Sequence, residues 1–213
     1  MTAPTSRAAI DAAIADLQAH RRAWAAVSPA ERAALAGELA RRFLAVADRW
    51  AAACETAEGI DPRRPCAGAG EEMLVGPYFI LRNLRLLRKS LLSIAKTGRP
   101  RLPGAVWTRP GGGADRGGDR LAARIFPQDL YDRLFYPGVT AEAWMEAGVI
   151  RDNLPEALAP AYDRTERAAG ASGGVALVLG AGNVSSIGPM DAFYKLFVED
   201  RVVLYKPNPA NAY

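Results

Sequence analysis

The chain has 213 residues, half of them apolar, and its 27 basic residues outnumber its 23 acidic ones, which gives a formal charge of +4. This length and composition are typical of a globular protein with one or two domains and a sizeable core. No run of about 18 uncharged apolar residues occurs, and Asp11 and Asp16 interrupt the segment where a signal peptide would need an unbroken apolar core. We therefore expect a cytoplasmic protein with no membrane partner.

The first third of the chain is predicted to be helical, and its first apolar stripe at helical spacing is Ile10, Ile14, Leu17 and Trp24. A second helix is expected to begin at "SPAE", where Ser28 and Glu31 can form a capping box around Pro29. One long helix should then run to a stop at Gly59. Its apolar stripe is Leu35, Leu39, Phe43, Val46 and Trp50.

The chain has two cysteines and one histidine, which is too few for a disulfide framework or a zinc site, so no metal is expected. Cys54 lies within about one turn of the second helix's apolar stripe, and this position indicates packing. Cys66 lies in the loop "PRRPCAGAG", where no histidine or acidic partner stands beside it. A catalytic role is not predicted for either thiol.

A third helix is predicted over roughly residues 72 to 96. Its basic positions Arg82, Arg85, Arg88 and Lys89 recur opposite Leu84, Leu87, Leu91 and Ile94. Such a stripe is typical of the solvated face of a packed helix. The alternative is that the basic segment 82–101 binds nucleic acid or an anionic surface. No aromatic residues alternate with the arginines as a stacking platform requires, so we expect no nucleic-acid partner.

After this helix the predicted structure changes from helices to short strands. Short strands are predicted near residues 105–108 and 121–126, and the Gly-rich "PGGGADRGGD" between them indicates an irregular hairpin. A phosphate-binding loop would need a helix after the glycines, whereas a second strand follows here. The segment from Pro127 to Gly170 mixes Pro and Gly with short helical pieces and is interpreted as a surface connection.

The segment from Gly173 onward is predicted to be a βαβ unit. The apolar run in "GGVALVLGAGN" is followed by the amphipathic "SSIGPMDAFYKLFVED" and by a second apolar run in "RVVLYKPN". A strand, helix and strand in this order require parallel strands, which are buried on both faces and therefore form near-continuous apolar runs. Because two parallel strands cannot cover themselves, we expect the chain to be truncated within a larger sheet.

The carboxyl ends of these two strands are the expected ligand site, because open parallel sheets bind ligands there. This rule should place residues 180–183 beside residues 206–208. The glycines permit close backbone approach, but Ser185 stands where the G-x-G-x-x-G fingerprint needs its third glycine. The second strand ends in Lys206, where an ordinary NAD-binding fold would have an acidic residue for the ribose hydroxyls. An ordinary Rossmann enzyme is therefore the weaker interpretation.

These residues resemble a segment of the aldehyde dehydrogenase superfamily. In "LGAGNVSSIGP…VVLYKPNP", an Asn follows the first cofactor-domain strand and "KP" follows the second, at the spacing of that family. The helices that include "SPAERAALAGELARRF" are similar to the family's N-terminal region, and the hairpin falls where its small β extension would begin. The resemblance implies an enzyme that oxidises an aldehyde through a thiohemiacetal on a cysteine and passes hydride to NAD or NADP.

The resemblance also implies roles for individual residues. Asn183 matches the family Asn whose side-chain amide donates to the oxyanion of the tetrahedral intermediate. Lys206 matches the Lys that hydrogen-bonds the adenosine ribose. The other implied coenzyme contacts are Leu179, Gly180, Ala181, Gly182, Asn208 and Pro209. The structural alternatives are an Asn that satisfies backbone groups in a strand-to-helix turn and a surface Lys at a strand end.

The sequence also departs from the family pattern. Ala181 and Gly182 stand where many members have Pro-Trp, and Pro209 replaces a Glu that is common in NAD-preferring members. Without that carboxylate nothing repels a 2′-phosphate, so the coenzyme could be NAD or NADP. The family's catalytic Cys and general-base Glu lie downstream of the "KP" position, and neither Cys54 nor Cys66 can replace the nucleophile.

We therefore expect an α/β protein with two parts. Residues 1–172 would form a helical region with an irregular hairpin and a connecting segment, and residues 173–213 would begin a Rossmann-like, NAD(P)-binding domain. The expected function is the N-terminal part of an NAD(P)-dependent aldehyde dehydrogenase-like oxidoreductase for a small aldehyde or acyl substrate. The part alone should be inactive, and the whole protein should be a homo-oligomer. The alternatives are an acyl-CoA reductase of the same superfamily, another Rossmann-type enzyme, and a non-catalytic binding module built on residues 82–101.

Overall fold

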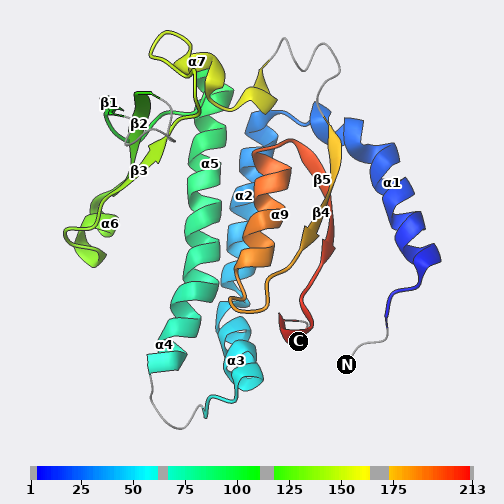
Figure 1. Ribbon diagram of the computed structural model, residues 1–213. Helices are drawn as coiled ribbons and strands as arrows, with labels where there is room; N and C mark the ends of the chain where they lie inside the picture. The colour runs from blue at the N-terminus through cyan, green and yellow to red at the C-terminus, as the bar shows by residue number, and fades with distance from the viewer. Residues whose placement is uncertain (1–3, 62–66, 111–117, 164–172, 212–213) are drawn as a thin grey trace.

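The structure is a computed structural model that describes residues 4–61, 67–110, 118–163 and 173–211. It is a mixed α/β chain with a three-stranded antiparallel sheet and a two-stranded parallel sheet (Figure 1). The helices are α1 (Arg7–Ala26), α2 (Pro29–Leu44), α3 (Ala47–Glu58), α4 (Ala67–Met73), the π-helix η1 (Leu74–Tyr78), α5 (Phe79–Thr97), α6 (Leu130–Phe135), α7 (Leu154–Ala157), the 3-10 helix η2 (Pro160–Tyr162), α9 (Ile187–Phe197) and the 3-10 helix η3 (Pro209–Asn211). The strands are β1 (Val106–Arg109), β2 (Arg120–Phe126), β3 (Ala141–Trp144), β4 (Gly174–Leu179) and β5 (Arg201–Lys206).

The capping box predicted at the start of α2 is confirmed. The Ser28 hydroxyl accepts from the backbone N–H of Glu31 at 3.2 Å, and the Glu31 carboxylate accepts from the backbone N–H of Ser28 at 2.8 Å. These two hydrogen bonds satisfy donors that have no partner inside the helix, and the Ser28 hydrogen bonds lower the pKa of Glu31.

The single long second helix was a wrong prediction, because the chain breaks between α2 and α3. Val46 lies outside helical geometry, at φ −118° and ψ 3°. A β-branched residue is a weak helix former, and this break turns α3 so that the rings of Phe43 and Trp50 meet edge to face at 5.2 Å. The predicted stop is confirmed, since Gly59 ends α3 in the left-handed region with φ 75°.

The buried face of α2 also differs from the predicted one. Leu35 and Leu39 are exposed, while Arg32, Ala33 and Ala36 are buried. The small alanines allow α2 to pack closely against α5, and the aliphatic part of the buried Arg32 contributes to the same face. Apolar periodicity identified the helix but selected the wrong side of it.

The third predicted helix is confirmed, and α4, η1 and α5 form one uninterrupted helical run (Figure 1). The π-helical turn η1 lies within this run and contains Gly76 and Pro77. The apolar face of α5 is confirmed, since Leu84, Leu91 and Ile94 are all buried.

The hairpin predicted before residue 127 is confirmed as the antiparallel pair β1 and β2. The interpretation of residues 127–170 as a surface connection was incomplete, because β3 lies in that segment and pairs with β2. A strand of four residues among Pro and Gly gives too little alternation to be recognised. Residues 111–117 of the Gly-rich turn, and Cys66, lie outside the described part of the chain.

The βαβ unit is confirmed with its strands parallel. β4 and β5 pair in register from Gly174 opposite Arg201 to Leu179 opposite Lys206, and α9 connects them. Figure 1 shows α9 and α5 on one side of this sheet and α1 on the other. Burial on both faces is only partial, because α1 packs near the start of the strands while Leu177 and Leu179 are 61% and 64% exposed.

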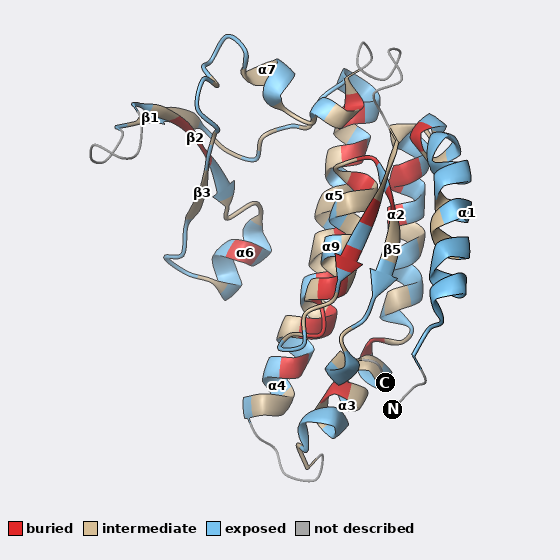
Figure 2. Cartoon of the chain, turned by 45° about the vertical axis from the view of Figure 1, so that its right-hand side comes forward, coloured by how far each residue is buried: buried red, intermediate tan, exposed pale blue. Residues whose placement is uncertain are grey.

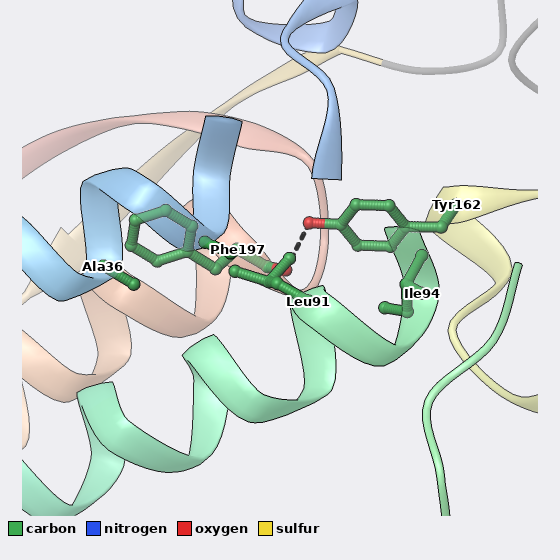
Figure 3. Close-up of a cluster of buried hydrophobic side chains, with 6 residues drawn as sticks. Ala36, Leu91, Ile94, Tyr162 and Phe197 are labelled. Carbon is green, nitrogen blue, oxygen red and sulfur yellow. Dashed lines mark hydrogen bonds between the residues drawn. The ribbon is translucent and has the colours of Figure 1, made fainter. Parts of the chain in front are cut away.

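The main core lies where α2, α5 and α9 meet. Its buried members are Ala33, Ala36, Leu91, Ile94, Tyr162 and Phe197. Figure 3 shows the Tyr162 hydroxyl among them, and it donates to the carbonyl oxygen of Phe197 at 2.6 Å. Figure 2 shows that buried residues concentrate on these facing surfaces, whereas most of α1 is exposed. Among the described residues, no helix has both the length and the apolar character needed to cross a bilayer.

Candidate functional site

The candidate site lies at the carboxyl ends of β4 and β5, which the structure brings together as predicted. The backbone N–H of Gly180 donates to the carbonyl oxygen of Lys206 at 2.9 Å. The side-chain amide of Asn211 donates to the carbonyl oxygen of Ala181 at 2.7 Å. Segments that are far apart in the sequence therefore form one continuous edge, at the position where open parallel sheets bind ligands.

The glycines at this edge are required by the packing of the chain against itself. A Cβ atom on Gly180 would lie 2.8 Å from the hydroxyl of Tyr205, and one on Gly182 would lie 2.9 Å from the amide nitrogen of Asn208. A Cβ on Gly188, in the first turn of α9, would overlap the same Tyr205 hydroxyl. Tyr205 and Asn208 occupy the space on the Cβ side of these glycines, while Gly182 remains exposed, so close approach of a ligand to this loop stays a prediction.

The side chain of Tyr205 lies between β5 and the first turn of α9. Burial raises the pKa of its phenol, and the nearby carboxylate of Asp191 raises it further. The neutral phenol therefore persists to a higher pH than that of a free tyrosine.

Asn183 and Lys206 remain available at this edge. Both residues are exposed, and neither side chain forms a hydrogen bond or ion pair with the part of the chain that the structure describes. Asn208 differs, because its side-chain oxygen accepts from the backbone N–H of Ala210 at 3.0 Å. Pro209 begins η3 and is exposed. An amide donor and an ammonium donor thus remain free to bind a ligand.

Two buried serines that follow Asn183 hold its loop in place. Ser185 and Ser186 are buried, at 6% and 0% exposure. The indole N–H of Trp50 in α3 donates to the Ser185 hydroxyl at 3.1 Å, and the Ser186 hydroxyl donates to the carbonyl oxygen of Val75 in η1. A π-helix leaves carbonyl groups out of the regular helical pattern, and π-helices often occur near functional sites. The residues just after Asn183 are therefore held by two separate helices.

This anchoring gives a testable expectation. Trp50→Phe keeps an aromatic ring but removes the donor to Ser185, which should cost about 1 kcal/mol of local stability. Backbone amides of Ser185 and Ser186 should then exchange with solvent about fivefold faster in native-state hydrogen exchange. Trp144→Phe is the matched control, because Trp144 lies in the other sheet. Unchanged exchange at both serines in the Trp50→Phe variant would contradict the anchoring.

A cavity of about 530 Å³ lies between α5 and the small sheet, and Met190 of α9 also lines it. Its other lining residues are mostly apolar or aromatic: Tyr78, Phe79, Arg82, Asn83, Leu86, Ile125, Phe126, Gln128, Tyr136, Val139 and Ala141. Burial and a hydrogen bond with Tyr136 raise the pKa of Tyr78. Sequence reasoning missed this cavity because its walls come from separate segments whose packing no local pattern reveals.

Part of the basic stripe of α5 forms ion pairs within the fold. The guanidinium of Arg82 lies 2.8 Å from the carboxylate of the buried Asp132, and that of Arg85 lies 2.6 Å from the carboxylate of Asp129. The side chain of Arg88 packs so closely on Gly37 of α2 that a Cβ there would be 3.2 Å from its Nε. Two cations of the segment 82–101 are therefore ion-paired, whereas its other basic side chains are exposed and form no ion pair with the described residues: Arg88, Lys89, Lys96, Arg99 and Arg101.

The other titratable groups at this edge among the described residues are the phenol of Tyr205 and the nearby carboxylate of Asp191. Cys54 is buried in α3 at 2% exposure, which agrees with the predicted packing role. The described residues contain no group of three or more His, Cys, Asp or Glu side chains placed to hold a metal ion. The arrangement can bind and orient a ligand, and its amide can stabilise a negative oxygen.

Comparison of the chain with protein-family models, with curated proteins and with solved structures gives no match.

Proposed function

We propose that this chain forms the coenzyme-binding and oxyanion-stabilising part of an NAD(P)-dependent aldehyde dehydrogenase-like oxidoreductase. The observation that supports it most is the parallel pairing that ends in Leu179 opposite Lys206. The exposed amide of Asn183 and the exposed ammonium of Lys206 lie at the carboxyl ends of these strands, in the order that the aldehyde dehydrogenase resemblance implies.

In this proposal Asn183 donates from its side-chain amide to the oxygen that becomes negative as a nucleophile adds to the substrate carbonyl. Such a donor lowers the barrier most when it is already in place before the reaction. The anchoring of Ser185 and Ser186 supports this role, because it restricts the loop while leaving the amide of Asn183 without a competing acceptor among the described residues.

The coenzyme would contact two parts of this edge, the end of β5 and the loop after β4. The free ammonium of Lys206 suits the ribose hydroxyls, and the exposed Leu179 beside it offers an apolar contact. Tyr205 and Asn208 occupy the Cβ sides of the loop glycines, so a pyrophosphate would approach the exposed Gly182 from its other side. When bound, NAD or NADP would supply the hydride acceptor. Pro209 brings no carboxylate to oppose a 2′-phosphate, so both coenzymes remain within the proposal.

The aldehyde or acyl substrate is assigned to the cavity that Met190 lines. Met190 lies in the helix that begins four residues after Asn183, and the cavity's aromatic walls suit an apolar substrate. The thiol that attacks the substrate carbonyl must reach this edge from elsewhere, since Cys54 is buried in α3. Acyl-CoA reduction would use the same donors and thiol on a thioester.

A non-catalytic module that uses residues 82–101 is less well supported. Arg82 and Arg85 are already paired with carboxylates, so strong, salt-dependent binding would depend on the remaining basic residues of the segment alone.

Coenzyme binding by this chain tests the proposal. NADPH fluorescence and calorimetry with NAD and NADP should give saturable binding, and Lys206→Ala should weaken it about tenfold through loss of a charged hydrogen bond. Lys96→Ala is the control, because Lys96 is an exposed lysine at the far end of α5. Binding that is equally strong in both variants, or no binding by the parent chain, would contradict the assignment of Lys206.

A further inference from the structure

The small antiparallel sheet presents one face that is rich in arginine. Trp107 pairs with Ala122 across β1 and β2, and Arg124 pairs with Glu142 across β2 and β3. Residues that pair directly across an antiparallel sheet point to the same side, and residues two apart in a strand do so as well. Trp107, Arg109, Arg124 and Glu142 therefore share one face.

The carboxylate that the described strands place on this face belongs to Glu142, and it is already paired with an arginine. The guanidinium of Arg109 donates to Glu142 twice, at 2.9 and 2.5 Å, and these hydrogen bonds lower the pKa of Glu142. Arg124 lies over the Trp107 ring with its guanidinium carbon 5.6 Å from the ring centre. Neither Arg124 nor Arg133 of α6 has an ion pair with the described part of the chain. Arg133 thus has no ion pair there, and Arg124 shares the carboxylate of Glu142, which Arg109 already binds.

Both of these arginines line a second cavity of about 530 Å³, between β1, β2, α6 and the segment that leads into β3. Trp107 and Tyr136 are also among its lining residues. The indole nitrogen of Trp107 is buried and has no hydrogen-bond acceptor. A buried donor without an acceptor is costly, so an acceptor brought within reach of it would be stabilising.

The position of Arg124 is fixed by the backbone around it. Its N–H donates to the carbonyl oxygen of Ala105 at 3.1 Å, and a Cβ on Gly104 would lie 2.9 Å from the Cβ of Arg124. The guanidinium therefore projects from a central strand whose backbone cannot easily shift. A site built on a strand holds its donors more accurately than a site built on loops.

From these observations we propose that Trp107, Arg124 and Arg133 bind the phosphate group of a small phosphorylated molecule. Two guanidiniums match the double negative charge and the several acceptor oxygens of a phosphate monoester, and they bind it through charge-assisted hydrogen bonds. The indole N–H can supply a further donor. The cavity has room for the organic part of the molecule, and the aromatic ring of Trp107 offers it a flat apolar contact.

The indole N–H of Trp107 gives a direct test. In ¹H–¹⁵N spectra of the whole chain, Trp107→Phe identifies its indole cross-peak. Inorganic phosphate and a small phosphomonoester such as glycerol phosphate are then titrated separately at low salt. We expect this cross-peak to move saturably with both, and to move less as NaCl is added, because the arginines are exposed. A cross-peak that stays in place with both probes would overturn the proposal.

Variants define the site further. Arg124→Met and Arg133→Met should each weaken phosphate binding about tenfold. Arg22→Met is the control, because it removes an exposed arginine of α1 far from this sheet. A similar loss in the Arg22→Met variant would overturn the proposal in favour of general attraction to positive charge. Movement of the cross-peak by phosphatidylglycerol vesicles but not by soluble phosphates would overturn it in favour of a membrane surface.

The ¹H–¹⁵N spectrum of each variant also shows whether that variant is folded. A methionine variant that does not fold is replaced by the lysine variant at the same position. Lysine keeps the positive charge but lacks the planar guanidinium, so it should weaken phosphate binding less than methionine does.

Discussion

Asp200→Asn is expected to lower the free energy of unfolding by about 3 to 5 kcal/mol, which is the usual cost of removing one partner from a buried ion pair. Asp200 and Arg32 are 1% and 0% exposed, and the guanidinium of Arg32 donates to the carboxylate of Asp200. Removing the carboxylate charge leaves a guanidinium in the interior with only neutral acceptors, namely the hydroxyl of Tyr162 at 3.1 Å and the carbonyl oxygen of Trp24 at 2.6 Å.

The contacts of Arg32 explain why the effect should extend through the fold. Its guanidinium carbon lies 4.5 Å from the centre of the Trp24 ring, and the Trp24 indole donates to the carbonyl oxygen of Leu196 in α9 at 3.2 Å. This one side chain therefore joins the junction of α1 and α2 to the turn that leads into β5.

A double-mutant cycle in urea measures the pair. Asn is chosen because Asp200 has φ 58°, a conformation that Asn tolerates better than most residues do. Arg32→Met should cost a similar amount on its own, and the double variant should cost clearly less than the sum, because it leaves no unpaired charge. Asp11→Asn, which removes an exposed pair with Arg7, should have no measurable effect. Additive losses in the cycle would contradict the coupling.

Under the proposed function, Asn183→Ala is expected to lower the turnover number of the active enzyme about 10²- to 10³-fold. The amide would act only on the charge that develops in the transition state, so the Michaelis constant and the coenzyme affinity should change little. Asn183→Asp keeps the size of the side chain but replaces a donor by a negative charge, and it should reduce turnover at least as much.

Steady-state kinetics with Lys206→Ala beside these variants separates the two roles. Lys206→Ala should weaken coenzyme binding with a smaller effect on turnover, which is the reverse of the pattern for Asn183. Thermal unfolding is the control for folding, because Asn183 is exposed and the loop is held by Ser185 and Ser186. Unchanged turnover in both Asn183 variants would remove the oxyanion role.

The parts of the fold that follow from local pattern could be predicted from the sequence. The capping box at Ser28, the apolar face of α5 and the closing βαβ unit each depend on residues close together in the chain. The convergence of the two strand ends followed from topology, because parallel strands place their carboxyl ends together.

The remaining features depend on contacts between distant segments. Leu35 is exposed because α5 packs on the alanine side of α2, and this choice depends on both helices. The break at Val46 and the strand β3 carry weak local signals that tertiary packing decides. The contact of Tyr205 with the loop glycines could not be predicted either, because it depends on the orientation of the Tyr205 ring toward α9.

The occupied glycine positions also change what a glycine pattern can reveal about distant relatives. Gly180, Gly182 and Gly188 are each constrained by a particular neighbour, Tyr205 or Asn208, rather than by a coenzyme. In relatives that keep this fold, a smaller residue at the position of Tyr205 should permit larger residues at the positions of Gly180 and Gly188. The three glycines are therefore a signature of how the strand ends pack, and their covariation with the residues of β5 is the quantity that should be followed through evolution.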